Sequence, residues 1–156
     1  MPKYLFGIYV HWPFCLAKCP YCDFNSHVHD RVNEAEMGEA LLSEIDHYAG
    51  LVGRRDVKSI FFGGGTPSLM SASTVEKVIN RIEHNFHTTN DIEITLEANP
   101  TSYETNKFKQ FKSAGINRVS LGVQSFNEKD LSVLGRKHSS QEAISAINSA
   151  SNIFSR

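Results

Sequence analysis

Cysteine is scarce in this sequence, and the few cysteines present are crowded together. Only three of the 156 residues are cysteine, and Cys15, Cys19 and Cys22 all lie within the stretch "CLAKCPYC". An odd number of thiols cannot pair fully in disulfides, and three are one too few for a closed four-thiolate zinc site. The scarcity therefore excludes a disulfide-rich scaffold and directs attention to one short loop.

Long apolar runs and a strong net charge are also missing. No segment approaches the roughly 18 apolar residues that span a bilayer, and the N-terminus "MPKYLFGIYVHW" lacks the pattern of a secretory signal. A net charge of -1 gives no reason to expect nucleic acid as a partner. We therefore expect a cytoplasmic protein without a transmembrane segment, in a reducing compartment that disfavours structural disulfides.

Strand and helix patterns alternate along the rest of the chain. Runs rich in β-branched and aromatic residues predict strands over 3–10, 57–62, 91–98 and 117–126. Apolar residues at helical spacing predict helices over 31–49, 73–86, 101–114, 127–134 and 139–154. Regular alternation with short connections indicates an α/β fold of parallel strands in βα units, joined by right-handed crossovers.

Polar residues that could cap helices support these boundaries. Asp30 is the predicted N-cap of the first helix. Three capping-box pairs are predicted for later helices, namely Ser73 with Glu76, Thr101 with Glu104, and Ser139 with Glu142. The inward stripes are expected to include Leu41, Leu42, Ile45, Tyr48 and Ala49 in the first helix, and Ile144, Ile147 and Phe154 in the last. Four βα units cannot close a barrel, and the sequence stops in "SNIFSR", so we expect residues 1–156 to form one domain that is incomplete at its C-terminus.

The three cysteines lie in a loop over residues 11–29 that directly follows the first strand. Functional residues collect at the carboxyl ends of strands in parallel α/β folds. Closely spaced thiolates suit a zinc ion or an iron–sulfur cluster, with plain thiols as a third alternative. Zinc would take its fourth ligand from His11, His27 or His29. A four-iron cluster needs only three cysteines if one iron is left open to a ligand.

The other strands also end in features that suit a ligand. The stretch "FFGGGTPS" follows the second strand, and its glycines permit close backbone approach and positive φ angles. It matches neither a P-loop nor a dinucleotide-binding motif, so by itself it fits an ordinary tight turn equally well. Glu97 ends the third strand and Gln124 the fourth. Each could simply finish a strand, but four such features on one edge favour a binding site.

The cysteine spacing C-x-x-x-C-x-x-C resembles that of the radical S-adenosylmethionine (SAM) superfamily. Four blocks, "YVHWPFCLAKCPYCDFNSH", "FFGGGTPSLM", "TLEANP" and "GINRVSLGVQSFNEKDLSVLGRKH", resemble the oxygen-independent coproporphyrinogen III oxidase-like family and, within it, the HemW-type heme chaperone branch. The resemblance implies the N-terminal four units of a partial (β/α)6 barrel. The later barrel strands and a C-terminal domain would then be absent from residues 1–156.

The resemblance also implies cofactors and residue roles. Cys15, Cys19 and Cys22 would ligate a [4Fe-4S] cluster whose open iron takes the amino and carboxylate groups of SAM. The positions that match SAM or cluster contacts are Tyr9, Tyr21, Gly64, Gly65, Thr66, Glu97, Gln124 and Arg136. A reductant protein would supply an electron to the cluster, and cleavage of SAM would yield a 5′-deoxyadenosyl radical.

Phe24 separates the two activities that the family suggests. The oxidase branch carries a further cysteine two positions after the third, where this sequence has Phe24. The resemblance therefore implies a chaperone that binds heme and passes it to heme-requiring proteins. Oxidation of coproporphyrinogen III in porphyrin biosynthesis is the enzymatic alternative, and a structural zinc module is the second. A fragment without function of its own is a further alternative.

Overall fold

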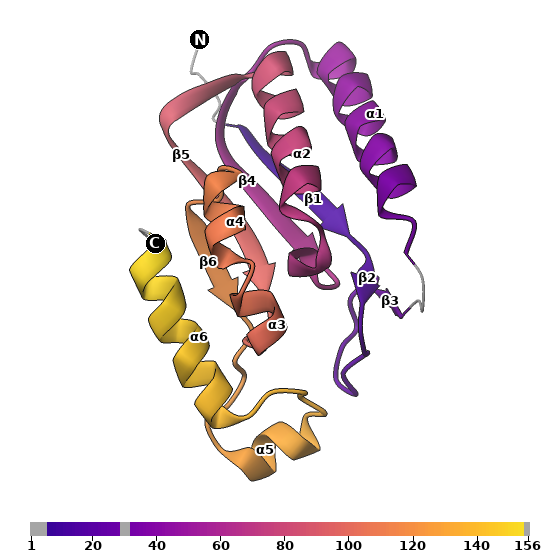
Figure 1. The fold of residues 1–156 in the computed structure, drawn as a ribbon. Helices are drawn as coiled ribbons and strands as arrows, with labels where there is room; N and C mark the ends of the chain where they lie inside the picture. The colour runs from indigo at the N-terminus through magenta and orange to yellow at the C-terminus, as the bar shows by residue number, and fades with distance from the viewer. Residues whose placement is uncertain (1–5, 29–31, 155–156) are drawn as a thin grey trace.

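Four parallel strands form the only large sheet in the part of the chain that the structure describes, residues 6–28 and 32–154 (Figure 1). The structure is a computed structural model. The strands are β1 (Phe6–Trp12), β4 (Asp56–Gly64), β5 (His87–Ala98) and β6 (Arg118–Leu121), paired in that order. The order in the sheet follows the order in the chain, as expected of successive right-handed βα units. The predicted parallel α/β fold is confirmed.

Helices cover one face of this sheet (Figure 1). They are α1 (Glu34–Val52), α2 (Ala72–Asn85), α3 (Ser102–Thr105), α4 (Phe108–Ser113) and α6 (Ser140–Ile153), with α5 (Glu128–Val133) beyond the end of β6. No helix among residues 6–28 and 32–154 is long and apolar enough to cross a membrane.

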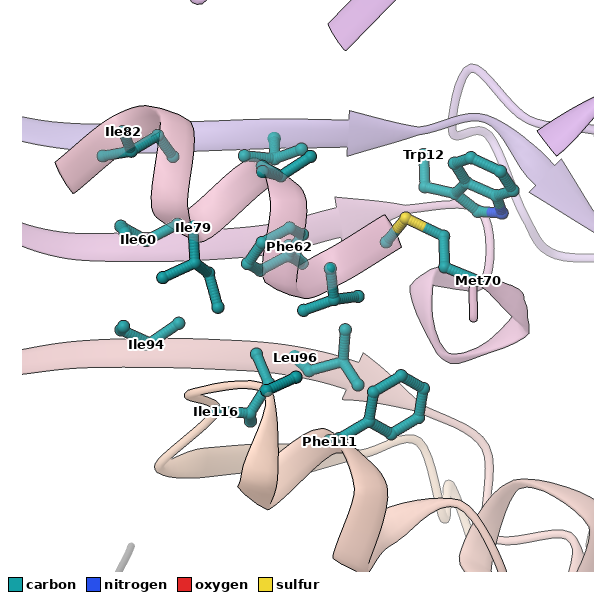
Figure 2. Close-up of a cluster of buried hydrophobic side chains, with 14 of the residues drawn as sticks. Trp12, Ile60, Phe62, Met70, Ile79, Ile82, Ile94, Leu96, Phe111 and Ile116 are labelled. Atoms are coloured by element: carbon teal, nitrogen blue, oxygen red, sulfur yellow. The ribbon is translucent and has the colours of Figure 1, made fainter. Parts of the chain in front are cut away.

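The core lies between the sheet and the helices that cover it, with alternate strand residues against the inner stripe of α2 and Phe111 of α4 beside them (Figure 2). Its fully or nearly buried members include Val10, Trp12, Ile60, Phe62, Val78, Ile79, Ile82, Ile94 and Leu96. The intervening strand residues, such as Tyr9 and Glu93, point to the other face and remain exposed or half-buried. This alternation follows from the two-residue period of a strand.

A small parallel ribbon holds the two ends of the cysteine loop together. Strand β2 (Phe14–Cys15) pairs with β3 (His27–Val28), and the His27 amide donates to the Pro13 carbonyl over 2.7 Å. The sequence did not predict this ribbon, because two-residue strands carry no periodic signal.

Two helix starts differ from the sequence predictions. Helix α1 begins at Glu34 with Asn33 as its N-cap, while the predicted cap Asp30 lies outside the described residues. The predicted Ser73–Glu76 capping box is wrong, because Ser71 is the N-cap of α2 and accepts from the Thr74 amide. Ser71 is the last extended residue before that helix, so it can turn its side chain back onto the first turn.

Two of the remaining elements are shorter than predicted. The predicted helix over 101–114 is two pieces, α3 and α4, and a 3-10 turn (η1, Pro67–Leu69) precedes α2. Thr101 caps α3 as predicted, but Glu104 accepts from the Asn99 amide instead of completing a capping box. The fourth strand stops at Leu121 rather than at 126. The capping box of Ser139 and Glu142 is confirmed.

The predicted inward stripes are correct in part. Leu42 is buried, Leu41, Ile45 and Ala49 pack against the core, and Phe154 is buried. The prediction is wrong for Tyr48, which is exposed on α1. It is also wrong for Ile144, which is exposed, because the buried stripe of α6 consists of small residues, Ala143, Ala146 and Ala150. Alanines allow α6 to lie close to its neighbours, which bulkier apolar residues would prevent.

Candidate cofactor site

A cavity of about 390 Å³ opens at the carboxyl-terminal edge of the sheet. Its volume is in the range of small-molecule sites. All three cysteines line it, together with the predicted contact residues Tyr21, Gly64, Gly65, Thr66, Glu97, Gln124 and Arg136. Residues that are more than a hundred positions apart in sequence thus meet at one edge, because parallel strands end on the same side.

Tyr9 is the predicted site residue that does not line this cavity. It is 58% exposed and its hydroxyl is hydrogen-bonded to His11 Nδ1 at 3.1 Å. Its ring stacks on Phe61 with centroids 6.1 Å apart, on the sheet face opposite the helices. Tyr9 precedes the end of β1 by three residues, so it stops short of the edge where the cysteine loop begins.

The three thiols share the cavity but do not converge on a point. Among residues 6–28 and 32–154, no group of three histidine, cysteine or acidic side chains is arranged to hold one metal ion. Of the histidines considered for zinc, His27 is exposed in β3, His11 Nε2 is bonded to the Asn25 carbonyl, and His29 lies outside the described residues. Three cysteines around one cavity match the number of thiolates that a four-iron cluster with one open iron would need.

The glycine segment lies directly against the start of the cysteine loop. The Gly65 amide donates to the Trp12 carbonyl over 2.6 Å, and the Thr66 amide donates to the Phe14 carbonyl over 2.9 Å. A Cβ atom on Gly65 would come within 2.7 Å of the Phe14 carbonyl oxygen. Gly64 has φ +113°, a conformation that favours glycine. The glycines thus permit a close approach of two backbone segments.

Arg136 reaches across the cavity from the turn after α5. Its Nη2 donates to the Gly122 carbonyl over 2.6 Å and to Asn99 Oδ1 over 2.5 Å. Its Nη1 lies 3.4 Å from Cys19 Sγ and 3.5 Å from the Tyr21 hydroxyl. The buried Nε has no partner among the residues that the structure describes, which leaves one donor of this guanidinium unused at the site.

Asn99 is a site residue that the sequence reasoning missed. It lines the cavity directly after β5 and bonds both Arg136 and Thr66. Asn99 lies in the dipeptide Asn99-Pro100, which is also typical of an ordinary strand end. Its position two residues beyond Glu97, at the functional edge, was the signal that could have identified it.

Burial shifts the ionisation of groups around the cavity. Burial raises the pKa of Glu97, and a hydrogen bond from the Gly64 amide only partly opposes this. Burial, followed by a hydrogen bond with Cys19, raises the pKa of Tyr21. Burial and the neighbouring Arg136 charge lower the pKa of His138. Independently of these shifts, Glu97 and Arg136 line the same cavity, and this pair suits a ligand that carries both an ammonium and a carboxylate.

Charged side chains from other elements fix the segment that follows the glycines. Lys107 Nζ donates to the carbonyls of Ser68, Leu69 and Met70 over 2.6–3.2 Å. Burial lowers the pKa of Lys107, and the charges of Glu34 and Glu104 oppose that shift. Buried ions are tolerated when their hydrogen bonds are satisfied. Lys107, the N-cap of α4, thus ties the segment after the glycines to the start of that helix.

A profile of the radical SAM superfamily matches residues 9–156. This match spans nearly the whole chain, including every cysteine and every strand-end feature. The chain belongs to the radical SAM superfamily. A radical SAM member is expected to hold the thiolates and its ligand at the strand ends, where the cavity lies.

Its relatives include two groups of longer proteins. "Radical S-adenosyl methionine domain-containing protein 1, mitochondrial" from Bos taurus is 43% identical over 148 residues, covering 95% of this chain and 34% of that protein. Heme chaperone HemW from Escherichia coli is 43% identical over 148 residues, covering 94% of this chain and 39% of that protein. The predicted similarity to the HemW branch is confirmed.

A solved structure has the same fold. Coproporphyrinogen III oxidase (HemN) from Escherichia coli, described as a radical SAM enzyme, matches with a TM-score of 0.87 and 30% identity, covering 99% of this chain and 36% of that one. This radical SAM chain therefore spans between 34% and 39% of the length of these three proteins.

Replacing Gly65 by alanine tests the close approach of the glycine segment. Gly65→Ala places Cβ against backbone atoms of Pro13 and Phe14, so we expect it to lower the free energy of unfolding by about 1–3 kcal/mol. Gly50→Ala is the matched control, because Gly50 is exposed in α1 with nothing within 4 Å. The control should raise the free energy of unfolding by about 0.5–1 kcal/mol. Urea unfolding followed by circular dichroism measures both, and equal tolerance of the two changes would contradict the close approach.

Proposed function

We propose that this chain binds a [4Fe-4S] cluster and SAM as part of a heme chaperone. The observation that supports the proposal most strongly is the single cavity that all three cysteines share with Glu97 and Arg136. Cys15, Cys19 and Cys22 would hold the cluster through their thiolates, which would leave one iron open to SAM. When bound and reduced, the cluster supplies one electron for reductive cleavage of the sulfonium of SAM.

The side chains of the cavity orient SAM and exclude water. Arg136 pairs with the carboxylate of SAM, because it lines the cavity and its fork of N–H donors matches a carboxylate. Glu97 and Gln124 bind the ammonium or the ribose hydroxyls. The glycine backbone of Gly64 and Gly65 leaves room for the ligand to approach the edge of the sheet.

Two observations favour the chaperone over the oxidase. The chain is 43% identical to the HemW chaperone of Escherichia coli and 30% identical to the HemN oxidase. Phe24, which lines the cavity, stands where the oxidase branch carries an additional cysteine. In this proposal heme is the cargo, heme-requiring proteins are its acceptors, and a reductant protein supplies an electron to the cluster.

The oxidase is the second candidate, and the TM-score of 0.87 to HemN favours it. The oxidase would be an enzyme, whereas a chaperone does not need to convert a substrate. The sequence predicts a cytoplasmic location, whereas the bovine relative carries the designation mitochondrial. Location therefore does not separate the two candidates.

Removal of the cysteines tests cofactor binding. Anaerobic reconstitution of the chain should give about four irons and about four sulfides per chain, and isothermal titration should then detect SAM binding. Each of the variants Cys15→Ala, Cys19→Ala and Cys22→Ala should lose most of the iron and sulfide, because a three-point attachment becomes a two-point one. Zinc without sulfide in the reconstituted chain, or equal iron and sulfide in a variant lacking all three cysteines, would contradict the proposal.

Heme transfer and porphyrinogen turnover separate the two candidates. We expect the reconstituted chain to take up heme and to pass it to an apo heme protein, as followed by absorbance of the acceptor. With coproporphyrinogen III and SAM we expect no decarboxylated product and no coupled 5′-deoxyadenosine in chromatography. Coupled formation of both products would establish the oxidase and reject the chaperone.

A further inference from the structure

Asn99 lies between two side chains that reach different cysteine sulfurs. We propose that Asn99 is a positioning residue that sets the hydrogen bonds to two of the three cluster thiolates and thereby raises the reduction potential of the cluster. This inference rests on the proposed function, because it assumes that Cys15 and Cys19 are cluster ligands.

Two chains of hydrogen bonds, here called arms, lead from Asn99 to the sulfurs. The first arm runs through Arg136 to Cys19. Asn99 Oδ1 accepts from Arg136 Nη2 over 2.5 Å, and Arg136 Nη1 reaches Cys19 Sγ at 3.4 Å. The guanidinium is planar, so fixing one of its terminal nitrogens fixes the direction of the other. Asn99, together with the Gly122 carbonyl that accepts from the same nitrogen over 2.6 Å, therefore determines where the Arg136 donor points.

The second arm runs through Thr66. Asn99 Nδ2 donates to Thr66 Oγ1 over 3.4 Å, and the Thr66 hydroxyl donates to Cys15 Sγ over 3.6 Å. Because the threonine oxygen accepts from the amide, its own hydrogen is directed to the sulfur. The amide orientation suits both arms at once: reversing it would place two donors, the amide nitrogen and the guanidinium, against each other.

The backbone of Asn99 is held by a hydrogen bond to a buried carboxylate. Its amide donates to Glu104 Oε2 over 2.7 Å. Glu104 is only 1% exposed and the same oxygen accepts from the Ser68 hydroxyl. Charge-assisted hydrogen bonds of this kind are short and directional. The side chain of Asn99 therefore projects from an anchored point.

Hydrogen bonds to cluster sulfurs affect the reduction potential. Reduction adds one negative charge that spreads onto the thiolates, so donors at these sulfurs stabilise the reduced form. The third sulfur lacks such support from Asn99, since Cys22 Sγ has Ser26 Oγ at 3.9 Å. The effect is thus assigned to Cys15 and Cys19.

The test is a redox titration of the reconstituted chain without SAM, followed by electron paramagnetic resonance. Asn99→Leu keeps the shape of the side chain and removes both arms. We expect the midpoint to become more negative, with reduction about tenfold less favourable, which for one electron is ~59 mV. Thr66→Val removes only the Cys15 arm and should shift the midpoint less, in the same direction. Asn106→Leu, at an exposed position after α3, is the matched control and should leave the midpoint unchanged.

The outcomes distinguish this inference from the proposed function. A wild-type chain that assembles the cluster, with Asn99→Leu at the same midpoint, would overturn the role of Asn99 and leave the cofactor proposal intact. A wild-type chain without a cluster would overturn the cofactor proposal itself. If Asn99→Leu assembles no cluster, Asn99→Ala takes its place, because it also removes both hydrogen bonds of the side chain: a negative shift supports the positioning role, and an unchanged midpoint overturns it.

Discussion

Two backbone hydrogen bonds hold the candidate site together. The Gly65 amide bonds the Trp12 carbonyl and the Thr66 amide bonds the Phe14 carbonyl, at 2.6 and 2.9 Å. They continue the parallel pairing of β1 with β4 beyond the sheet and into the loop that carries the cysteines. The cysteine loop has little apolar burial of its own, so its position depends on this contact. The absence of a side chain at Gly65 is what allows the two segments to approach.

Two groups of polar side chains surround the contact between the glycine segment and the cysteine loop. Inside the cavity, Arg136 and Asn99 connect the ends of β5 and β6 to the cysteine loop. Behind it, Lys107 and Glu104 tie the segment after the glycines to α3 and α4. A site whose donors are held by anchored neighbours loses little free energy to ordering when a ligand binds. The cavity thus has the preorganisation that a radical reaction or a cofactor-dependent chaperone needs.

Much of this arrangement could be predicted from the sequence, because strand patterns and cysteine spacing are local signals. Parallel strands put Glu97, the glycines and the cysteines on one edge, and that edge is where the cavity lies. Interactions between distant segments could not be predicted. Ser71 rather than Ser73 is the cap of α2, and its hydroxyl also donates to Glu34 from another helix, a long-range contact with no local signal. The role of Asn99 depends on partners 33 and 37 residues away, which no local pattern reveals.

The most direct test of the shared site is the effect of SAM on the reduced cluster. The electron paramagnetic resonance spectrum of the reduced, reconstituted chain is recorded before and after adding SAM. If the iron without a cysteine ligand faces the cavity, SAM binds that iron and the resonance positions shift. A bound cluster whose spectrum is the same with and without saturating SAM would contradict a common site for the cysteines and the strand-end residues.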